Sequence, residues 1–383
     1  MSLTFLSLRD FKCHAELDLQ LASFTVLTGL NSAGKSTVCH ALALLGQSIR
    51  EGRDSSRGEL ILNGDLVRLG TVGDVRNQAS DHDLFELSVR DEVREVSWRF
   101  DGERRASKAT LADCTLRMLD GEKATTYSVL APDDPTVSPL VNRLRELVYV
   151  TILRNDPSVI PRMTGTESEL RIGTLGDGAV ALLHFRDQDK VSDSLCIENV
   201  PPTLPRQVEA WMSHFFPGFA MDIQPVDGSM DVLTLRIRTD MSGEFHLPAN
   251  VGYGPYYALP IVTAALSAKT DGGFLVLDSP EAHLHPRCQN EMAKFLARVA
   301  ATGVQILVET HNDHFINGAR QAVKEGLLDP ASAIIHYFGA AEDGDGAHKH
   351  STVSINSEGA LDHWPKGFCD QYEFDLASLA DWN

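Results

Sequence analysis

"FTVLTGLNSAGKSTVCHALALL", Phe24 to Leu45, joins an apolar run, a glycine-bearing turn and a helical apolar pattern. The turn from Gly29 to Ser36 fits G-x-x-x-x-G-K-[ST] at every fixed position. Glycines let the backbone curl so that its N–H groups point at phosphate oxygens, and the start of the next helix adds its dipole. Lys35 would then reach the β and γ phosphates, and the Ser36 hydroxyl would bind Mg²⁺. The stretch therefore predicts a nucleotide-binding loop between a strand and a helix, rather than an ordinary Gly/Ser turn.

The composition is that of a large globular protein. The chain has 383 residues and is 43% hydrophobic, which is enough for the cores of one or two domains. Its six cysteines are scattered and form no C-x-x-C pair, as expected in a reducing cytoplasm. No apolar run approaches the length of a membrane span, and the start lacks the layout of a signal peptide. We therefore expect a cytoplasmic protein without a membrane partner.

The charge balance is strongly acidic. Thirty-four Lys and Arg against 53 Asp and Glu give 34 − 53 = −19, which opposes sequence-blind DNA binding by the monomer. The densest basic cluster is "RFDGERRASK", residues 99–108. Such a cluster is either a solvated face or a local contact for a polyanion. We expect any binding of nucleic acid to depend on ATP or on a partner.

Two later apolar runs end in polar residues. Phe274 to Leu277 is followed by Asp278, and Val304 to Val308 is followed by Glu309, Thr310 and His311. Continuous apolar runs are typical of strands buried on both faces, and parallel sheets present ligand groups at the carboxyl ends of their strands. Asp278 would hold Mg²⁺ through water opposite Ser36, and His311 would hydrogen-bond the γ-phosphate. Together with the loop, these segments predict a nucleoside triphosphatase.

The histidines allow a rival interpretation. His283 and His285 flank Leu284, and His311 and His314 lie one helical turn apart. Ligands of these types can build a transition-metal site. However, the sequence contains no H-E-x-x-H motif, and H-x-H before Pro286 is also typical of a packed turn.

The order of the motifs resembles a known group. A P-loop, a long insertion, "LVLDSPEAHLHP" and "VETHNDHF" are similar to the ABC-type ATPase heads of the RecF, SMC and overcoming-lysogenisation-defect group. "ETHNDHFINGARQAVKEGLL" and the WP-x-GF tail in "GALDHWPKGFCDQYEFDLASL" resemble a bacterial subfamily of AAA-type ATP-binding proteins that ends in a domain of unknown function. The resemblance implies ATP and Mg²⁺ as cofactors and a homodimer with nucleotides between facing subunits. It also implies a role in DNA repair or antiviral defence, beside a nuclease or another effector.

The resemblance assigns roles to individual residues. The phosphates would be bound by Asn31, Ser32, Ala33, Gly34, Lys35, Ser36 and Thr37. Gln78 would join the metal and the attacking water, with Gln47 as the second candidate. The dimer-facing signature would lie in "NVGYGPYYALPIVTAAL" and include Asn250, Gly252, Gly254 and Tyr256.

Two positions depart from the pattern of the group. Tyr256 stands where the group usually has a serine, which removes a hydroxyl contact to the γ-phosphate. Ser279 stands where most ABC heads have the general base, and serine is not a base near neutral pH without help. Glu281 is the nearest carboxylate, so we expect it to be the catalytic base.

The remaining segments complete the predicted architecture. "LFELSVR" and "EVSWRF" alternate as antiparallel strands do, and "TLPRQVEAWMSHFF" favours an amphipathic helix after Pro205. The predicted fold class is α/β, an ABC-type P-loop ATPase head with an inserted α+β lobe and a short C-terminal extension. The predicted parts are residues 1–91 and 248–340 of the head, the lobe at 92–247 and the extension at 341–383.

The predicted function is that of an ATP-binding and ATP-hydrolysing subunit. It would dimerise with ATP and control a partner in nucleic-acid processing or anti-phage defence. Glu281 and His311 favour this enzyme. Ser279 and Tyr256 favour the alternative, a non-hydrolysing ATP sensor or scaffold that assembles an effector complex.

Overall fold

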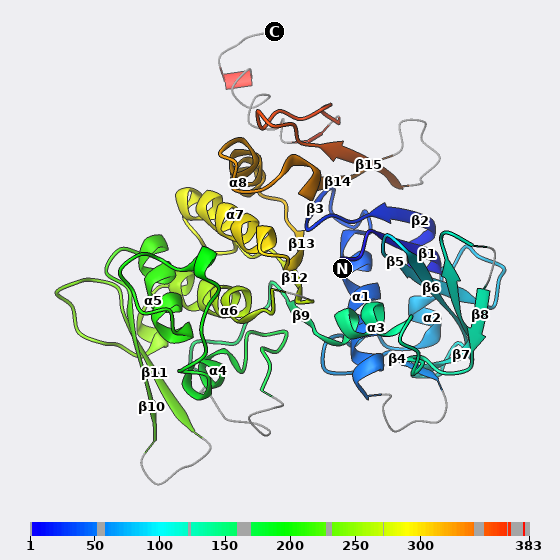
Figure 1. The fold of residues 1–383 in the computed structure, drawn as a ribbon, viewed down its shortest axis with the longest axis horizontal. Coiled ribbons are helices and arrows are strands. Elements are labelled where there is room, and N and C mark those ends of the chain that lie inside the picture. Colours follow the sequence, from blue (N-terminus) through cyan, green and yellow to red (C-terminus); the bar gives the residue numbers. More distant parts are fainter. Residues whose placement is uncertain are drawn as a thin grey trace.

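The parallel sheet at the centre of the molecule carries the segments that the sequence singles out. The structure, a computed structural model, describes residues 2–51, 58–121, 124–158, 170–226, 232–270, 272–340, 348–365, 367–368 and 378–379. Within these residues the central sheet has the strand order β15-β14-β3-β13-β12-β9, parallel except for β15 (Figure 1). Its strands are β3 (Phe24–Gly29), β9 (Leu147–Val150), β12 (Phe274–Asp278), β13 (Gln305–Glu309), β14 (Ala333–Ala340) and β15 (His348–Ser354).

Both faces of this sheet are covered, which explains its continuous apolar strands. Helix α1 (Lys35–Glu51) shares one apolar cluster with Val276 and Leu307, whose side chains point to one face. Helices α6 (Tyr253–Ser267), α7 (Pro286–Ala301) and α8 (Asp313–Lys324) share the other cluster with Leu277 and Val308. The predicted α/β class is confirmed.

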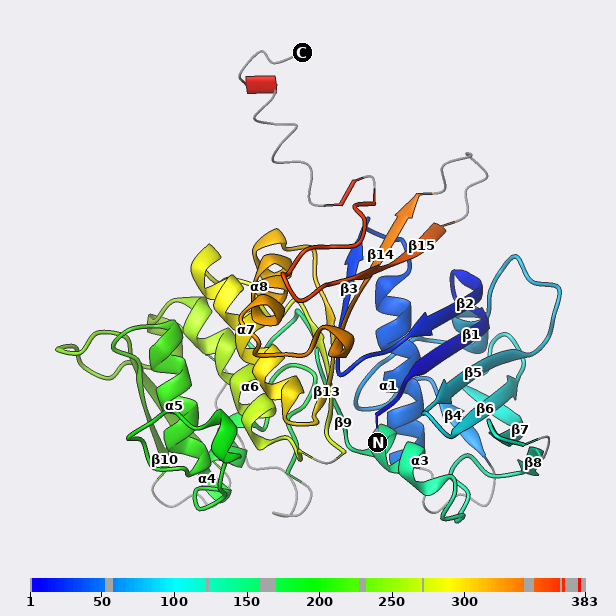
Figure 2. The ribbon, with the colours of Figure 1, turned by 45° about the horizontal axis from the view of Figure 1, so that its top comes forward.

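An antiparallel sheet lies beside α1 (Figure 2). Among the described residues its order is β2-β1-β5-β6-β7-β4, and β8 pairs with β7. The strands are β1 (Phe5–Phe11), β2 (His14–Gln20), β4 (Glu59–Ile61), β5 (Phe85–Arg90), β6 (Arg94–Asp101), β7 (Lys108–Met118) and β8 (Ala124–Tyr127), with α2 (Val72–Val75) nearby in sequence. The boundary expected at residue 92 falls between β5 and β6, which are hydrogen-bonded neighbours. The division into 1–91 and 92–247 stays a prediction.

The segment from 138 to 247 starts on the α1 side of the central sheet, and its later elements extend the molecule on the other side (Figure 1). It begins with α3 (Ser138–Arg145), which contacts α1, and then supplies β9 to the central sheet. The rest contains α4 (Ala179–Phe185), α5 (Leu204–Phe215) and the hairpin of β10 (Ala220–Pro225) and β11 (Leu233–Arg238). Pro205 lies in the first turn of α5, where its missing N–H has no helical acceptor to lose.

The C-terminal residues pack on the central sheet. β15 pairs with β14, and Phe368 is buried against Tyr337 of β14. Trp364 contacts Phe368, and the Arg320 guanidinium of α8 lies 5.2 Å from the Trp364 ring centre. The expected extension at 341–383 is described only at 348–365, 367–368 and 378–379, so the rest of that expectation lies outside the described residues.

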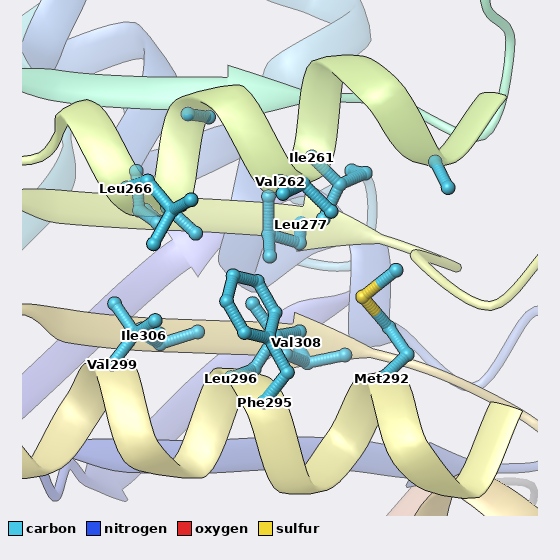
Figure 3. Packing of buried hydrophobic residues seen from close by; sticks show 14 of the residues in the cluster. Ile261, Val262, Leu266, Leu277, Met292, Phe295, Leu296, Val299, Ile306 and Val308 are labelled. Atoms are coloured by element: carbon cyan, nitrogen blue, oxygen red, sulfur yellow. The ribbon is translucent and has the colours of Figure 1, made fainter. Parts of the chain in front are cut away.

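The helices α6 and α7 pack their apolar side chains against each other and against β12 and β13 (Figure 3). Phe295 of α7 is at the centre of this packing and is 1% exposed. Its ring centre lies 4.7 Å from that of Trp211 and 5.8 Å from that of Phe215, both on α5. Phe295 therefore joins the central sheet to the α4–β11 segment.

We expect Phe295→Ala to lower the free energy of unfolding by about 3–5 kcal/mol, because it removes a buried ring and leaves a cavity. Urea unfolding followed by circular dichroism would measure the loss. Met241→Ala is the control, since Met241 is 83% exposed, and its effect should stay within about 0.5 kcal/mol. Equal stability of Phe295→Ala and the wild type would contradict the role of this ring.

Candidate functional site

The loop between β3 and α1 has the backbone conformation that its glycines permit. Gly29 has φ 124° and Gly34 has φ 98°, values that L-residues rarely adopt. A Cβ on Gly29 would lie 2.1 Å from the Phe338 carbonyl oxygen, and one on Gly34 would lie 2.4 Å from His14 Nε2. The loop is therefore wedged between β14 and the start of β2, with α1 beginning directly at Lys35.

Lys35 is held inside this loop. Its side chain is buried, and its Nζ donates to the carbonyl oxygens of Gly29, at 3.2 Å, and Leu30, at 2.6 Å. Burial lowers the pKa of Lys35, and the charges of Glu309 and Asp278 act in the opposite direction. A phosphate within the loop would find this ammonium group already positioned.

A hydroxyl and two carboxylates meet beside the loop. Ser36 Oγ donates to Glu309 Oε1 at 2.8 Å, and Glu309 is paired in register with Asp278 of the neighbouring strand. Burial raises the pKa of Glu309, and the charge of Asp278 adds to that effect. Mg²⁺ prefers oxygen ligands, takes one or two carboxylates and completes its shell with phosphates and water. Ser36, Asp278 and Glu309 fit such an ion.

Glu281 lies in the turn after β12 and is 5% exposed. Its Oε1 accepts a hydrogen bond of 2.5 Å from Thr310 Oγ1, whereas its Oε2 has no partner within the described part of the chain. Burial raises the pKa of Glu281 to about 7, and the Thr310 hydrogen bond and Arg154 limit the rise. A carboxyl group with this pKa can accept a proton near neutral pH.

Arg154 approaches the same carboxylates from the segment after β9. Its side chain is buried, and its Nη2 donates to the Ser279 carbonyl oxygen at 3.2 Å. Its Nε and Nη1 have no hydrogen-bond partner among the residues that the structure describes. Burial lowers the pKa of Arg154 to about 10, while Asp278, Glu281 and Tyr257 act to raise it. The site thus contains a buried cation beside its acidic groups.

His311 follows β13 and is exposed at the edge of the loop. Burial of part of the ring and the charge of Lys35 lower the pKa of His311, and the Gly29 backbone and Asp278 act to raise it. The following helix, α8, is capped by Asn312, whose side chain accepts from Phe315 N. The strand end and the helix cap together fix His311 beside Lys35.

The two glutamine candidates differ in their surroundings. Gln47 is fully buried in α1, and its amide is bonded to the backbone of Ile61, Leu66 and Val67. These bonds fix the segment around β4 and already occupy the Gln47 amide, and its expected role as the second candidate stays a prediction. Gln78 is exposed and follows Asn77, whose N–H donates to Asp10 O in the β1–β2 turn. That turn also places His14 against Gly34.

The expected signature lies at the start of α6. Gly252 is the N-cap residue, Pro255 lies in the first turn, and no atom lies within 4 Å of a Cβ built on Gly252. Gly254 faces the turn after β12, because a Cβ there would lie 3.1 Å from the His283 carbonyl oxygen. Asn250 ends a short 3₁₀ turn before the helix, and Tyr256 is partly buried against the apolar core.

The structure gives the histidines of the rival metal interpretation other contacts. The His283 ring packs against Tyr253 and Tyr257, and His285 Nδ1 accepts from Arg287 N at the start of α7. Within the described ranges, no group of three or more His, Cys, Asp or Glu side chains could hold a metal ion.

The charge of the basic cluster at 99–108 is partly neutralised, because Arg99 pairs with Asp113 and Lys108 pairs with Glu59.

From the sequence alone, Glu309 has no assigned site role, and Arg154 is either a phosphate or partner contact or a member of a structural salt bridge. Glu309 is the last residue of β13, as Asp278 is of β12, and Arg154 lies shortly after the end of β9. Applying the strand-end rule to every such strand would have placed both side chains at the site.

Two parts of the chain match known protein families, and the fold is similar to solved structures. Residues 217–316 match the family described as AAA ATPase domain, and residues 328–379 match the family described as Protein of unknown function (DUF3696). An SMC head bound to the C-winged helix domain of ScpA is similar, with 14% identity, a TM-score of 0.52, and coverage of 93% of this chain and 98% of that chain. An SMC head domain from Pyrococcus furiosus, with an extended coiled coil and bound to the C-terminal domain of ScpA, has 13% identity, a TM-score of 0.51, and coverage of 99% of each chain. No curated protein sequence matches this chain.

The predicted head fold is confirmed by these two structures. No helix in the described segments is long and apolar enough to cross a membrane. The predicted resemblance is confirmed as a similarity: residues 217–316 match an AAA ATPase domain, residues 328–379 match a family of unknown function, and the fold is similar to that of SMC heads.

Proposed function

We propose that the chain binds and hydrolyses ATP with Mg²⁺, closes as a homodimer through its ATP sites, and thereby controls a partner in nucleic-acid processing or anti-phage defence. The observation that carries the proposal is the meeting of Lys35, the Ser36–Glu309 pair, Asp278 and Glu281 at one edge of the central sheet. A cation for phosphates, oxygen ligands for Mg²⁺ and a proton acceptor are the groups that phosphoryl transfer to water needs.

Glu281 is proposed as the general base. When bound, Mg²⁺–ATP supplies the γ-phosphoryl group that is transferred to water, with ADP as the leaving group. Glu281 Oε2 has no partner in the described part of the chain, so it can accept the proton of that water. Thr310 fixes the other carboxylate oxygen and so orients the group.

Ser279 is proposed to support the metal site rather than to act as the base. Its Oγ donates to Asp278 Oδ1 at 2.9 Å, and its N–H donates to the Glu309 carbonyl oxygen at 2.8 Å. Its φ is 48°, which turns the chain sharply after β12 and brings Glu281 back toward the sheet. Serine at this position therefore suits a site in which the base comes two residues later.

Dimerisation is proposed from the start of α6. Gly252 is exposed, and the first turn of the helix leaves backbone amides unpaired, which suits an anion on a facing subunit. The SMC heads with a similar fold are bound to domains of ScpA, and by analogy we propose that a partner protein binds this head. A role in DNA repair or defence beside a nuclease or another effector is proposed from the resemblance of the sequence motifs alone.

The first test concerns nucleotide binding. We expect Lys35→Ala to abolish measurable ATP binding without unfolding the chain, because it removes the cation placed on the β and γ phosphates. Isothermal titration calorimetry with Mg²⁺–ATP would measure the loss, and circular dichroism would check the fold. Lys324→Ala, at an exposed position in the last turn of α8, is the matched control. Equal affinity of Lys35→Ala and wild type would refute the assignment of the loop.

The second test concerns the base. Glu281→Gln keeps the shape of the side chain and removes the proton acceptor, so we expect turnover to fall by about 10²–10⁴. Bound ATP should then persist, and a dimer that ATP closes should accumulate. Phosphate release and size-exclusion chromatography would be measured on the same samples.

The outcomes of the second test separate the parts of the proposal. Lost turnover with more dimer supports both Glu281 and ATP-driven closure. Lost turnover without added dimer supports the base but contradicts closure of the chain by ATP alone. Unchanged turnover rejects Glu281 as the base, and a wild type that binds ATP without releasing phosphate favours the sensor or scaffold.

The third test uses pH. A general base works as the carboxylate, and the pKa of Glu281 is raised to about 7. We therefore expect turnover at saturating ATP to fall about tenfold per pH unit as the pH drops below this value, and to level off above it. Phosphate release measured between about pH 5 and pH 9 would give the profile. A rate that stays flat down to the acidic limit, with the fold intact, would contradict the role of Glu281.

A further inference from the structure

The buried guanidinium of Arg154 is a charged group of the site to which the proposed function gives no role. Arg154 is 7% exposed, and its Nη2 is hydrogen-bonded to the Ser279 carbonyl oxygen. Its Nε and Nη1 have no partner in the described ranges, and neither has Glu281 Oε2. Burying a cation with unsatisfied donors is costly, so such donors are expected to meet an anion in the working state.

We infer that Arg154 is a further catalytic residue, which contacts the terminal phosphate of the nucleotide bound in the same subunit and stabilises the negative charge that develops during hydrolysis. The inference rests on the proposed function, since it needs the nucleotide in the β3–α1 loop. Arg154 would be an additional residue of the site, and the charge that it recognises would be that of the terminal phosphate.

The position of Arg154 within the fold supports the inference. The segment after β9 runs past the end of β12, where Ile152 N donates to Asp278 Oδ2 at 3.4 Å. Arg154 Nη2 then reaches the residue next to Asp278. The guanidinium is thus placed beside the proposed metal ligand and the proposed base, where a terminal phosphate would lie between them and Lys35.

The chemistry of the guanidinium fits a phosphate better than it fits the neighbouring carboxylate alone. Its planar fork can give parallel N–H bonds to phosphate oxygens, and it keeps its charge at neutral pH. A closed ion pair with Glu281 would satisfy the same atoms, but it would also favour the ionised form of that carboxylate. Within the described residues that pair is open, because Arg154 Nε, Arg154 Nη1 and Glu281 Oε2 have no hydrogen-bond partner.

Arg154 is also held in place before any phosphate arrives. Thr151 N donates to Thr174 O at 2.9 Å, and Asn155 N donates to Leu175 O at 2.8 Å, so the chain is tied on both sides of Arg154. The Tyr257 ring of α6 lies 5.7 Å from the guanidinium carbon. A preorganised donor in a buried site costs little reorganisation as charge develops.

The test compares ground-state and transition-state binding. The variants are Arg154→Met, which removes the charge and the donors, and Arg154→Lys, which keeps the charge without the fork. The matched control is Arg171→Met, since Arg171 is an exposed arginine outside the site. For each full-length protein, one measures Mg²⁺–ATP affinity, phosphate release, melting temperature and retention of ADP with orthovanadate, which mimics the transferred phosphoryl group.

We expect Arg154→Met to bind Mg²⁺–ATP within about tenfold of wild type while turnover falls by about 10²–10³ and vanadate-dependent retention of ADP is lost. Arg154→Lys should recover part of the turnover, and Arg171→Met should match the wild type. Wild-type retention of ADP with vanadate by Arg154→Met would overturn the inference. So would a parallel loss of ATP affinity, turnover and melting temperature, because that pattern marks a structural ion pair.

The outcomes distinguish this inference from the proposed function. Phosphate release by the wild type, with Arg154→Met unchanged, overturns only the role of Arg154. Absence of phosphate release by the wild type at saturating ATP overturns the proposed ATPase and the inference together.

Discussion

The register of three parallel strands is the constraint on which the site depends. Asp278 pairs with Glu309, and Glu309 pairs with Leu27, two residues before the loop glycine at 29. Hydrogen bonds between parallel strands therefore bring residues separated by more than two hundred positions to one edge. A shift by one residue would turn the side chain of Asp278 or Glu309 to the opposite face of the sheet. Close packing of differently shaped apolar side chains on both faces opposes such a shift, and so does the burial of a carboxylate that it would cause.

The same edge concentrates charge in a dry environment, and burial decides the properties of its groups. Burial raises the pKa of Glu281 and Glu309 and lowers that of Arg154. Each of these groups is thus less fully charged, or more costly to charge, than it would be in water. Opposite charges placed together offset part of this cost, which is why the acidic groups are found with Lys35 and Arg154.

The predictable parts of the fold are those with a local signal. Burial on one or both faces produces a regular apolar pattern in neighbouring residues. This pattern made it possible to predict the strands that end in Asp278 and Glu309 and the amphipathic helix at Leu204–Phe215, and the glycine spacing did the same for the loop. The pairing of β5 with β1 could not, since strands so far apart carry no shared local pattern. Arg154 could not be given one definite role for a similar reason. Its partners lie more than a hundred residues away in the sequence, and a single arginine forms no motif with a recognisable spacing.

Through the strand β14, the C-terminal region forms part of the central sheet. The match to the family of unknown function begins at residue 328, so it includes β14 and β15. β14 lies directly against β3, and its Phe338 carbonyl oxygen leaves room for nothing larger than glycine at position 29. This region therefore packs directly against the β3–α1 loop. The two matched regions contribute strands to one sheet on either side of β3, so the strand that leads into the loop is packed between them.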